Sequence, residues 1–171
     1  MDLYLIRHAD ALPLGEEGIT EDAARPLSNE GVAQCEVLAA ALRHHGIHVD
    51  AIVTSPLVRA HQTAAGIVKS LPPPAAGTAE CSELAPGGKR RKLAKFLREL
   101  GGNSVALVGH QPDLGKLAAW LIGNKDAQID LAKGGMAHIT CPDGPGKGAG
   151  ILLALVTPDW YSVVTSSNVG R

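Results

Sequence analysis

The 171-residue chain has few aromatic residues and almost no charge imbalance. It contains one Phe, two Trp and two Tyr, and its 16 Lys and Arg residues nearly balance 17 Asp and Glu residues, for a formal net charge of -1. Proteins that bind nucleic acid usually combine a basic field with aromatic side chains on which bases stack. We therefore expect no nucleic-acid partner.

The chain also lacks a long apolar run. No stretch reaches the roughly 18 apolar residues of a membrane-spanning helix, and the first residues have neither the basic segment nor the apolar core of a secretory leader. We expect a cytoplasmic protein without a membrane partner. Cys35, Cys81 and Cys141 are odd in number and widely spaced, which predicts buried reduced thiols rather than a disulfide framework or a zinc site.

Short apolar runs alternate with segments of helical periodicity. This alternation predicts an α/β fold, a three-layer α/β/α sandwich with a mostly parallel central sheet. Two late apolar segments separated by a Pro- and Gly-rich turn predict a C-terminal antiparallel hairpin. The expected strands are 3–6, 50–54, 104–108, 136–141 and 150–156, and the expected helices are 28–46, 56–69, 88–101 and 112–122. We expect one domain over residues 1–160 and a tail over 161–171.

Two connections are long enough to carry function. Residues 9–24 form a polar segment that we expect to be a loop and a candidate lid, followed by Arg25 and Pro26. Residues 75–87 are also expected to be a loop, and this loop contains Glu83.

Three of the expected strands stop at residues that suit phosphate chemistry. His8, Ser55 and His110 each stand at the end of such a run, and Arg59 follows Ser55 by one helical turn. Ligands of open α/β sheets bind beyond the carboxyl ends of the strands, so these side chains are expected to share one crevice. Ser55 itself is expected to cap the following helix rather than to act as a nucleophile.

The residue types in this crevice fit phosphoryl transfer. The guanidinium groups of Arg7, Arg25 and Arg59 can form paired hydrogen bonds with phosphoryl oxygens. A neutral imidazole can attack phosphorus, and nearby arginines disfavour the imidazolium, so we expect a lowered pKa for His8. His110, at the start of a helix, can bind the same anion.

Three motifs resemble those of the histidine phosphatase, or phosphoglycerate mutase-like, superfamily. The segment Leu5–Ala9 is similar to its Arg-His-Gly signature, with Ala9 in the glycine position. The segment Ser55–Thr63 resembles its S-P-x-x-R-A-x-Q-T motif, and Val108–His110 resembles its second-histidine motif. The residues Arg25–Ser28 and Gly109–Pro112, with the short chain, resemble the SixA-type phosphohistidine phosphatases.

The resemblance implies a role for each matched residue. His8 is the expected nucleophile, Arg7 and Arg59 bind the phosphoryl group, and His110 binds it from the opposite side. Arg25 is a further phosphate contact. No metal and no cofactor are implied. Larger relatives use a glutamate as general acid, and Glu83 is the candidate for that role.

We therefore expect a phosphohydrolase with a phosphohistidine intermediate that acts on phosphohistidine of a signalling protein, such as a histidine phosphotransfer domain. A broad-specificity phosphatase for small phosphate esters is the main alternative, and mutase activity is less favoured because few insertions could enclose a substrate. Because Ala9 replaces glycine, a second alternative is a phosphate-binding module without catalytic activity. A third alternative is a metallophosphatase that uses His8, Asp10, His110 and Asp113 as ligands.

One charge run stands apart from these motifs. Lys89, Arg90, Arg91 and Lys92 are consecutive near the start of an expected helix. Such a run is typical of a solvated helix face, and its other interpretation is a surface that guides a phosphorylated protein to the crevice.

Overall fold

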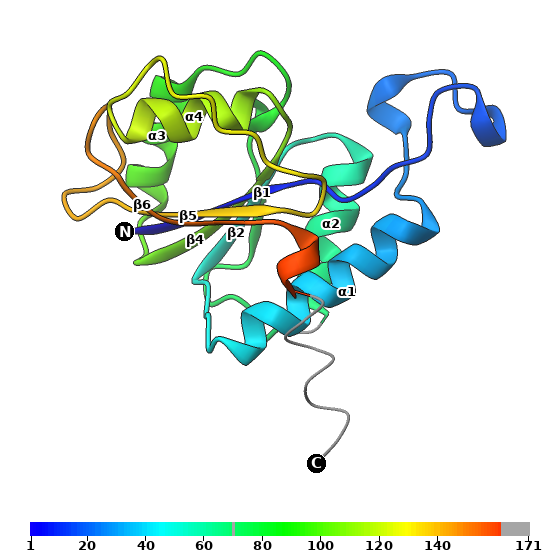
Figure 1. Cartoon of the computed structure of the whole chain (residues 1–171), viewed down its shortest axis with the longest axis horizontal. Coiled ribbons are helices and arrows are strands. Elements are labelled where there is room, and N and C mark those ends of the chain that lie inside the picture. Colours follow the sequence, from blue (N-terminus) through cyan, green and yellow to red (C-terminus); the bar gives the residue numbers. More distant parts are fainter. Residues whose placement is uncertain (70, 162–171) are drawn as a thin grey trace.

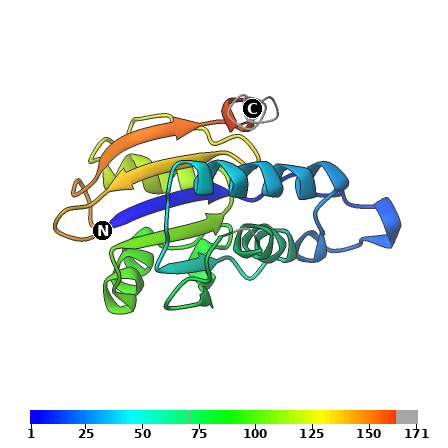
Figure 2. The same ribbon diagram turned by 90° about the horizontal axis from the view of Figure 1, so that it is seen from below.

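A six-stranded mixed sheet lies at the centre of the computed structural model, which describes residues 1–69 and 71–161. The strands follow the order β3-β2-β4-β1-β5-β6, as Figure 2 shows for most of them. β3, β2, β4 and β1 run parallel, whereas β5 is antiparallel to both β1 and β6. The strands are β1 (Asp2–Arg7), β2 (Ala51–Thr54), β3 (Thr78–Glu80), β4 (Ser104–Gly109), β5 (Met136–Thr140) and β6 (Ile151–Val156).

Helices cover both faces of this sheet (Figure 1). One face carries α1 (Asn29–His44) and α2 (Val58–Val68), and the other carries α3 (Arg90–Leu100) and α4 (Asp113–Leu121). Short 3-10 turns are η1 (Glu16–Gly18), η2 (Asp22–Ala24) and η3 (Ser82–Leu84). The predicted three-layer α/β/α sandwich with an antiparallel C-terminal hairpin is confirmed.

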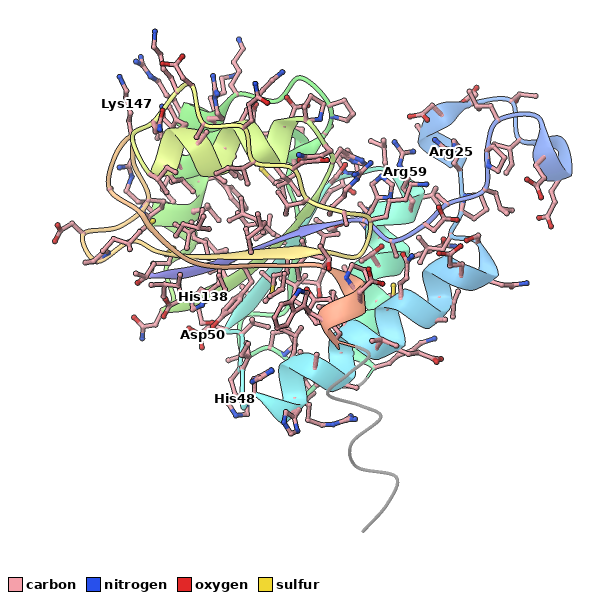
Figure 3. The ribbon with its side chains drawn as sticks, viewed as in Figure 1. Arg25, His48, Asp50, Arg59, His138 and Lys147 are labelled. Atoms are coloured by element: carbon pink, nitrogen blue, oxygen red, sulfur yellow. The ribbon has the colours of Figure 1, made fainter. Side chains whose placement is uncertain are left out.

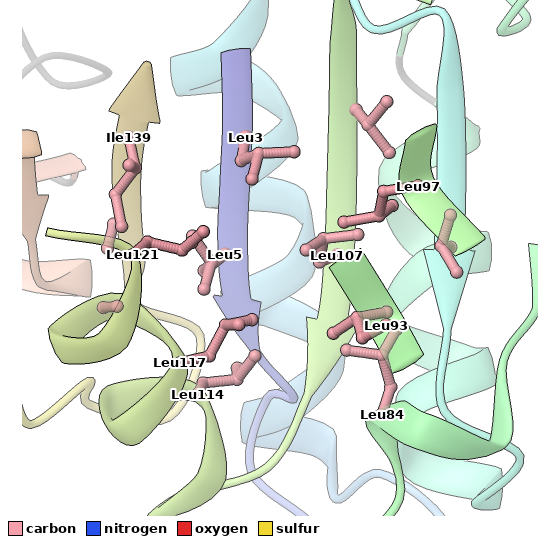
Figure 4. Packing of buried hydrophobic residues seen from close by; sticks show 14 of the residues in the cluster. Leu3, Leu5, Leu84, Leu93, Leu97, Leu107, Leu114, Leu117, Leu121 and Ile139 are labelled. Carbon is pink, nitrogen blue, oxygen red and sulfur yellow. The ribbon is translucent and has the colours of Figure 1, made fainter. Parts of the chain in front are cut away.

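The alternation of side chains along the central strands builds two separate cores. Leu3 and Leu5 of β1 pack with Leu107 toward α3 and α4 (Figure 4), whereas Tyr4 and Ile6 pack toward α1 and α2. Successive side chains of a strand point to opposite faces, so a strand covered on both sides must be apolar throughout. This requirement explains the continuous apolar runs of the sequence.

Two details of the predicted elements are wrong. The segment 75–87 was expected to be a loop, but residues 78–80 of it form β3 at the sheet edge. Its three residues, Thr, Ala and Glu, are partly or largely exposed and carry no apolar run that could signal a strand. The second helix was expected to open at Pro56, but α2 begins at Val58 with Leu57 as its N-cap.

The strand order brings the three predicted strand ends together. β4 lies between β1 and β2, with Gly109 opposite Arg7 and Val108 opposite Thr54. The next residues, His8, Ser55 and His110, therefore leave three adjacent strands at the same edge. In Figure 2 the loop that follows β1 projects beyond this edge.

The loop after β1 is fastened to the start of α1. Ser28 caps α1 as predicted, because its Oγ accepts a hydrogen bond from the Gly31 amide at 3.1 Å. The Ser28 amide donates to the carbonyl of Asp10, and a Cβ at position 31 would overlap that carbonyl oxygen. Glycine at position 31 thus permits the close approach of this loop to the helix.

Three further expectations concern the cysteines, membrane-spanning helices and the C-terminal tail. All three cysteines are free and buried, as predicted. None of the helices within the described residues is long and apolar enough to span a membrane. The predicted tail over residues 161–171 lies outside the described residues except for Tyr161.

Candidate active site

His8 leaves β1 with its ring held in one orientation. Its Nδ1 lies 2.7 Å from the carbonyl oxygen of Ala9, and its Nε2 lies 3.2 Å from Nε of Arg59. A carbonyl oxygen only accepts hydrogen bonds and an arginine Nε–H only donates. Nδ1 of His8 therefore carries the proton, and the lone pair of Nε2 accepts the hydrogen bond from Nε–H of Arg59.

Ala9 fits its place without strain. It is fully buried, and its amide donates to Thr63 Oγ1 at 3.1 Å. Among the described residues, Glu17 is the one non-glycine residue with positive φ, so Ala9 does not need the left-handed conformation that favours glycine. Alanine in the glycine position leaves the loop intact.

His110 lies next to His8 at the ends of β4 and β1. The two ring centroids are 5.0 Å apart with planes tilted by 54°, and both side chains are buried. His110 Nε2 lies 2.8 Å from Ser55 Oγ, while its Nδ1 is buried without a hydrogen-bond partner. Ser55 was expected to cap α2, but its hydroxyl instead contacts His110 and accepts from the Leu57 amide at 3.3 Å, ahead of the helix.

Two arginines flank the histidine pair. Arg59, at the first turn of α2, is only 5% exposed and donates from Nε to His8. Arg7 donates from Nη1 to the Leu131 carbonyl at 2.7 Å, and its Nε is buried without a partner. Each guanidinium is thereby fixed in direction.

Arg25 reaches this cluster through Asp22, an acidic residue that belongs to none of the sequence motifs. Asp22 accepts from Arg25 Nη1 at 3.0 Å and from Arg59 Nη2 at 2.9 Å, and its carbonyl accepts from Arg59 Nη1. Arg25 also donates to the carbonyls of Leu12 and Ala11. Figure 3 shows Arg25 and Arg59 near each other at this end of the molecule. Asp22 is one of four acidic residues in residues 16–22, and nothing in the sequence distinguishes it from the other three as a partner of the arginines.

Burial dominates the titration of both histidines. It lowers the pKa of His8 to about 4, opposed by the hydrogen bond to Ala9 and helped by the positive charges of Arg59 and Arg7. Burial likewise lowers the pKa of His110 to about 4, with the neighbouring His8 and Arg59 acting in the same direction. The expected lowering for His8 is present, but desolvation outweighs the arginines as its cause.

Glu83 lies in η3, close to His110. Both residues line one small pocket, together with Asp113. The carboxylate of Glu83 accepts from the Lys89 amide at 2.6 Å and lies 3.7 Å from Lys92 Nζ. These contacts hold the carboxylate of Glu83 in place but do not show that it transfers a proton. Its role as general acid therefore stays a prediction.

The residues considered for a metal site have other partners. The Asp10 carboxylate accepts from Ser28 Oγ and pairs with Lys133, and Asp113 accepts from the Gly87 amide. Within residues 1–69 and 71–161, no three His, Cys, Asp or Glu side chains are grouped so that they could hold a metal ion. The four residues of the metallophosphatase alternative do not form a ligand set.

Comparison with known proteins finds relatives among the histidine phosphatases. The sequence profile of the histidine phosphatase superfamily (branch 1) matches residues 3–95. An uncharacterized protein of Picosynechococcus is 34% identical over 80% of this chain and 82% of its own length. The phosphohistidine phosphatase SixA of Escherichia coli strain K12 is 28% identical over 71% of this chain and 74% of its length.

Solved structures share the whole fold. The protein histidine phosphatase SixA complexed with tungstate superimposes with a TM-score of 0.81 and 25% identity, covering 93% of this chain and 98% of that one. The alpha-ribazole phosphatase from Shigella flexneri has a TM-score of 0.71 at 19% identity, covering 92% and 97%. At 19% identity, the similarity to the alpha-ribazole phosphatase shows a shared fold and nothing more.

Proposed function

Because the chain belongs to the histidine phosphatase superfamily, which supports phosphatase activity, we propose that it hydrolyses phosphoryl groups through a covalent phosphohistidine formed on His8, without a metal ion. The observation that carries this proposal is the orientation of His8. Its proton is held on Nδ1 by the Ala9 carbonyl, and its Nε2 lone pair faces a buried arginine.

The first step forms a nitrogen–phosphorus bond. The Arg59 Nε–H moves from the Nε2 lone pair of His8 to a phosphoryl oxygen. Nε2 then attacks phosphorus while the bond to the leaving group breaks, and the leaving atom takes a proton from water or from Glu83. Arg7 and Arg59 hold the phosphoryl oxygens and offset their charge. The buried polar atoms Arg7 Nε and His110 Nδ1, which have no partner among the described residues, are available for the same oxygens.

The second step returns His8 to its starting form. Water attacks phosphorus, the bond to Nε2 breaks, and inorganic phosphate leaves with the oxygen and protons of that water. The low pKa of His8 keeps Nε2 unprotonated at neutral pH, so the nucleophile is ready for the next cycle.

As substrate we propose phosphohistidine on a signalling protein, with a histidine phosphotransfer domain as the first partner to test. Transfer from one imidazole to another exchanges similar leaving groups, so it depends little on a general acid. The similarity to the SixA proteins supports this substrate class.

A small phosphate ester is the second candidate. The shared fold with a phosphatase for alpha-ribazole phosphate favours it, because the same scaffold then serves a small molecule. An ester oxygen is a poorer leaving group than an imidazole nitrogen, so this reaction requires the general acid more strongly.

The test is a comparison of substrates with a search for the intermediate. The protein is incubated with a phosphorylated histidine phosphotransfer domain and with a panel of small phosphate esters, and specific rates are compared. We expect faster release from the domain and an acid-labile, base-stable phosphoenzyme that is absent in His8→Ala. Faster ester turnover would support the second candidate. Phosphate binding without turnover would support an inert module, and activity only with added divalent metal would contradict the metal-free mechanism.

A further inference from the structure

A basic groove lies on the α3–α4 face of the molecule. It has a volume of about 600 Å³ and is lined by seven of the chain's 16 Lys and Arg residues, with no acidic residue in its lining. The basic residues come from four separate segments: Lys89–Lys92 at the start of α3, Lys116 in α4, Lys125 after α4, and Lys147 before β6. The tertiary structure thus gathers charge that the sequence disperses.

The groove adjoins the small pocket beside His110. Gly88 and Arg90 line both the groove and the small pocket that contains Glu83 and His110. α3 and α4 each begin near that pocket, since Asp113 and the 83–90 segment belong to it. In Figure 3, Lys147 lies on the same face but at the end of the sheet opposite Arg25 and Arg59. The groove therefore leads from the pocket beside His110 along this face of the molecule.

Most of the groove's charge is available to a partner. All seven basic residues are exposed. Within the described residues, the one ion pair that any of them forms is that of Lys92 with Glu83, at a distance of 3.7 Å. Arg90 donates to the Lys116 carbonyl, which holds α3 and α4 together without neutralising either charge. A chain with a net charge of -1 thus concentrates uncompensated positive charge at one place.

We propose that this groove, lined by Lys89–Lys92, Lys116, Lys125 and Lys147, is the docking surface for an acidic face of the phosphorylated protein substrate. This inference rests on the proposed function and adds the electrostatic character of the partner. Opposite charge on the two surfaces steers the encounter and orients the phosphohistidine toward His8. A small phosphate ester reaches only the crevice and gains nothing from the groove.

The test uses a charge-reversed groove and a matched control. The groove variant is Arg91→Glu with Lys147→Glu, and the control is Lys69→Glu with Lys95→Glu, which changes the net charge equally outside the groove. The probes are an acidic histidine phosphotransfer domain phosphorylated with phosphoramidate, and p-nitrophenyl phosphate. We expect the groove variant to lose about 10-fold or more in kcat/KM for the domain, with a weaker salt dependence. Turnover of p-nitrophenyl phosphate should stay within about twofold of the unsubstituted protein, and the control should keep both activities.

Binding is measured separately so that the two proposals can fail independently. In a His8→Ala background, which blocks turnover, the Kd of the phosphorylated domain should rise about 10-fold in the groove variant and little in the control. Equal loss in both variants, or no loss in either, would overturn the docking surface. Tighter binding of tripolyphosphate than of the domain would also overturn it, in favour of a small polyanion. Absence of turnover on either phosphorylated probe by the unsubstituted protein would contradict the proposed function instead.

Discussion

Arg59 Nε donates a hydrogen bond to His8 Nε2 at 3.2 Å, so the proposed nucleophilic atom and the guanidinium proposed to bind phosphate are in direct contact. The remaining nitrogens of Arg59 contact Asp22. One planar group thus holds the lone pair of His8 and carries the donors that we propose bind an incoming phosphoryl group. Lysine offers a single ammonium with no such fork.

Replacing Arg59 by Lys should therefore lower kcat/KM for p-nitrophenyl phosphate by about 10²-fold, the usual cost of losing one donor to a developing oxyanion. Arg91→Lys, at an exposed position, serves as the control and should have no effect on this substrate. Steady-state kinetics give both values. Equal activity of Arg59→Lys and the unsubstituted protein would remove Arg59 from the phosphate site.

We expect the Asp22 carboxylate to compete with phosphate for two arginines. It accepts from both Arg25 and Arg59, and its side chain is 52% exposed. Exposed ion pairs are worth about 0.2–1 kcal/mol, so Asp22→Asn should lower the inhibition constant of inorganic phosphate by a factor between about 1.4 and 5. Glu21→Gln on the same loop is the control. A weaker affinity for phosphate in Asp22→Asn would instead show that Asp22 positions the arginines.

Ser55 is expected to act through His110. Its hydroxyl lies 2.8 Å from His110 Nε2 and is fully buried. Ser55→Ala should lower kcat/KM by about 10-fold, since a lost buried hydrogen bond costs on the order of 1–2 kcal/mol. A double-mutant cycle with His110→Ala tests the coupling. An unchanged effect of Ser55→Ala in the His110→Ala background would show that Ser55 acts independently.

Glu83 should matter for oxygen esters more than for phosphohistidine. As general acid it would protonate an alkoxide leaving group, a contribution of about 10²–10⁴ in rate. Glu83→Gln is therefore expected to slow hydrolysis of an alkyl phosphate by at least about 10-fold and to affect phosphohistidine much less. The substitution keeps an oxygen acceptor for the Lys89 amide. If neither substrate is affected, the role of Glu83 as acid is wrong.

The buried histidines should make folding stability depend on pH. The pKa of His8 and that of His110 fall to about 4 in the folded chain, whereas an unfolded chain takes up these protons near pH 6.5. The unfolded state therefore binds more protons between these values, and the free energy of unfolding should decrease as pH falls from about 6.5 to about 4. For each histidine the loss is about 1–3 kcal/mol.

Urea titrations at pH 7, 5.5 and 4.5 measure this effect, with His8→Gln as the comparison. The variant removes one of the two groups and should lose less stability over the same interval. Parallel curves for the two proteins would show that His8 titrates alike in the folded and unfolded chains.

The sequence determined the architecture because the required pattern is local. A strand buried on both faces must be continuously apolar, and helices on such a sheet must be amphipathic, so 3–6, 50–54 and 104–108 could be recognised one at a time. β3 was not predicted, because a three-residue strand at the edge of the sheet does not need a continuous apolar run. His8, Arg59 and His110 were identified by their position at the ends of these elements and by their resemblance to known motifs.

Only the tertiary structure decided which charges meet. The contact of Asp22 with Arg59 spans 37 residues, and the basic groove combines segments that lie from residue 89 to residue 147. The low pKa values of the two histidines also follow chiefly from burial, which the sequence does not display. Electrostatic interactions act through space and depend on solvent exposure, so they follow from the folded arrangement rather than from the order of residues along the chain.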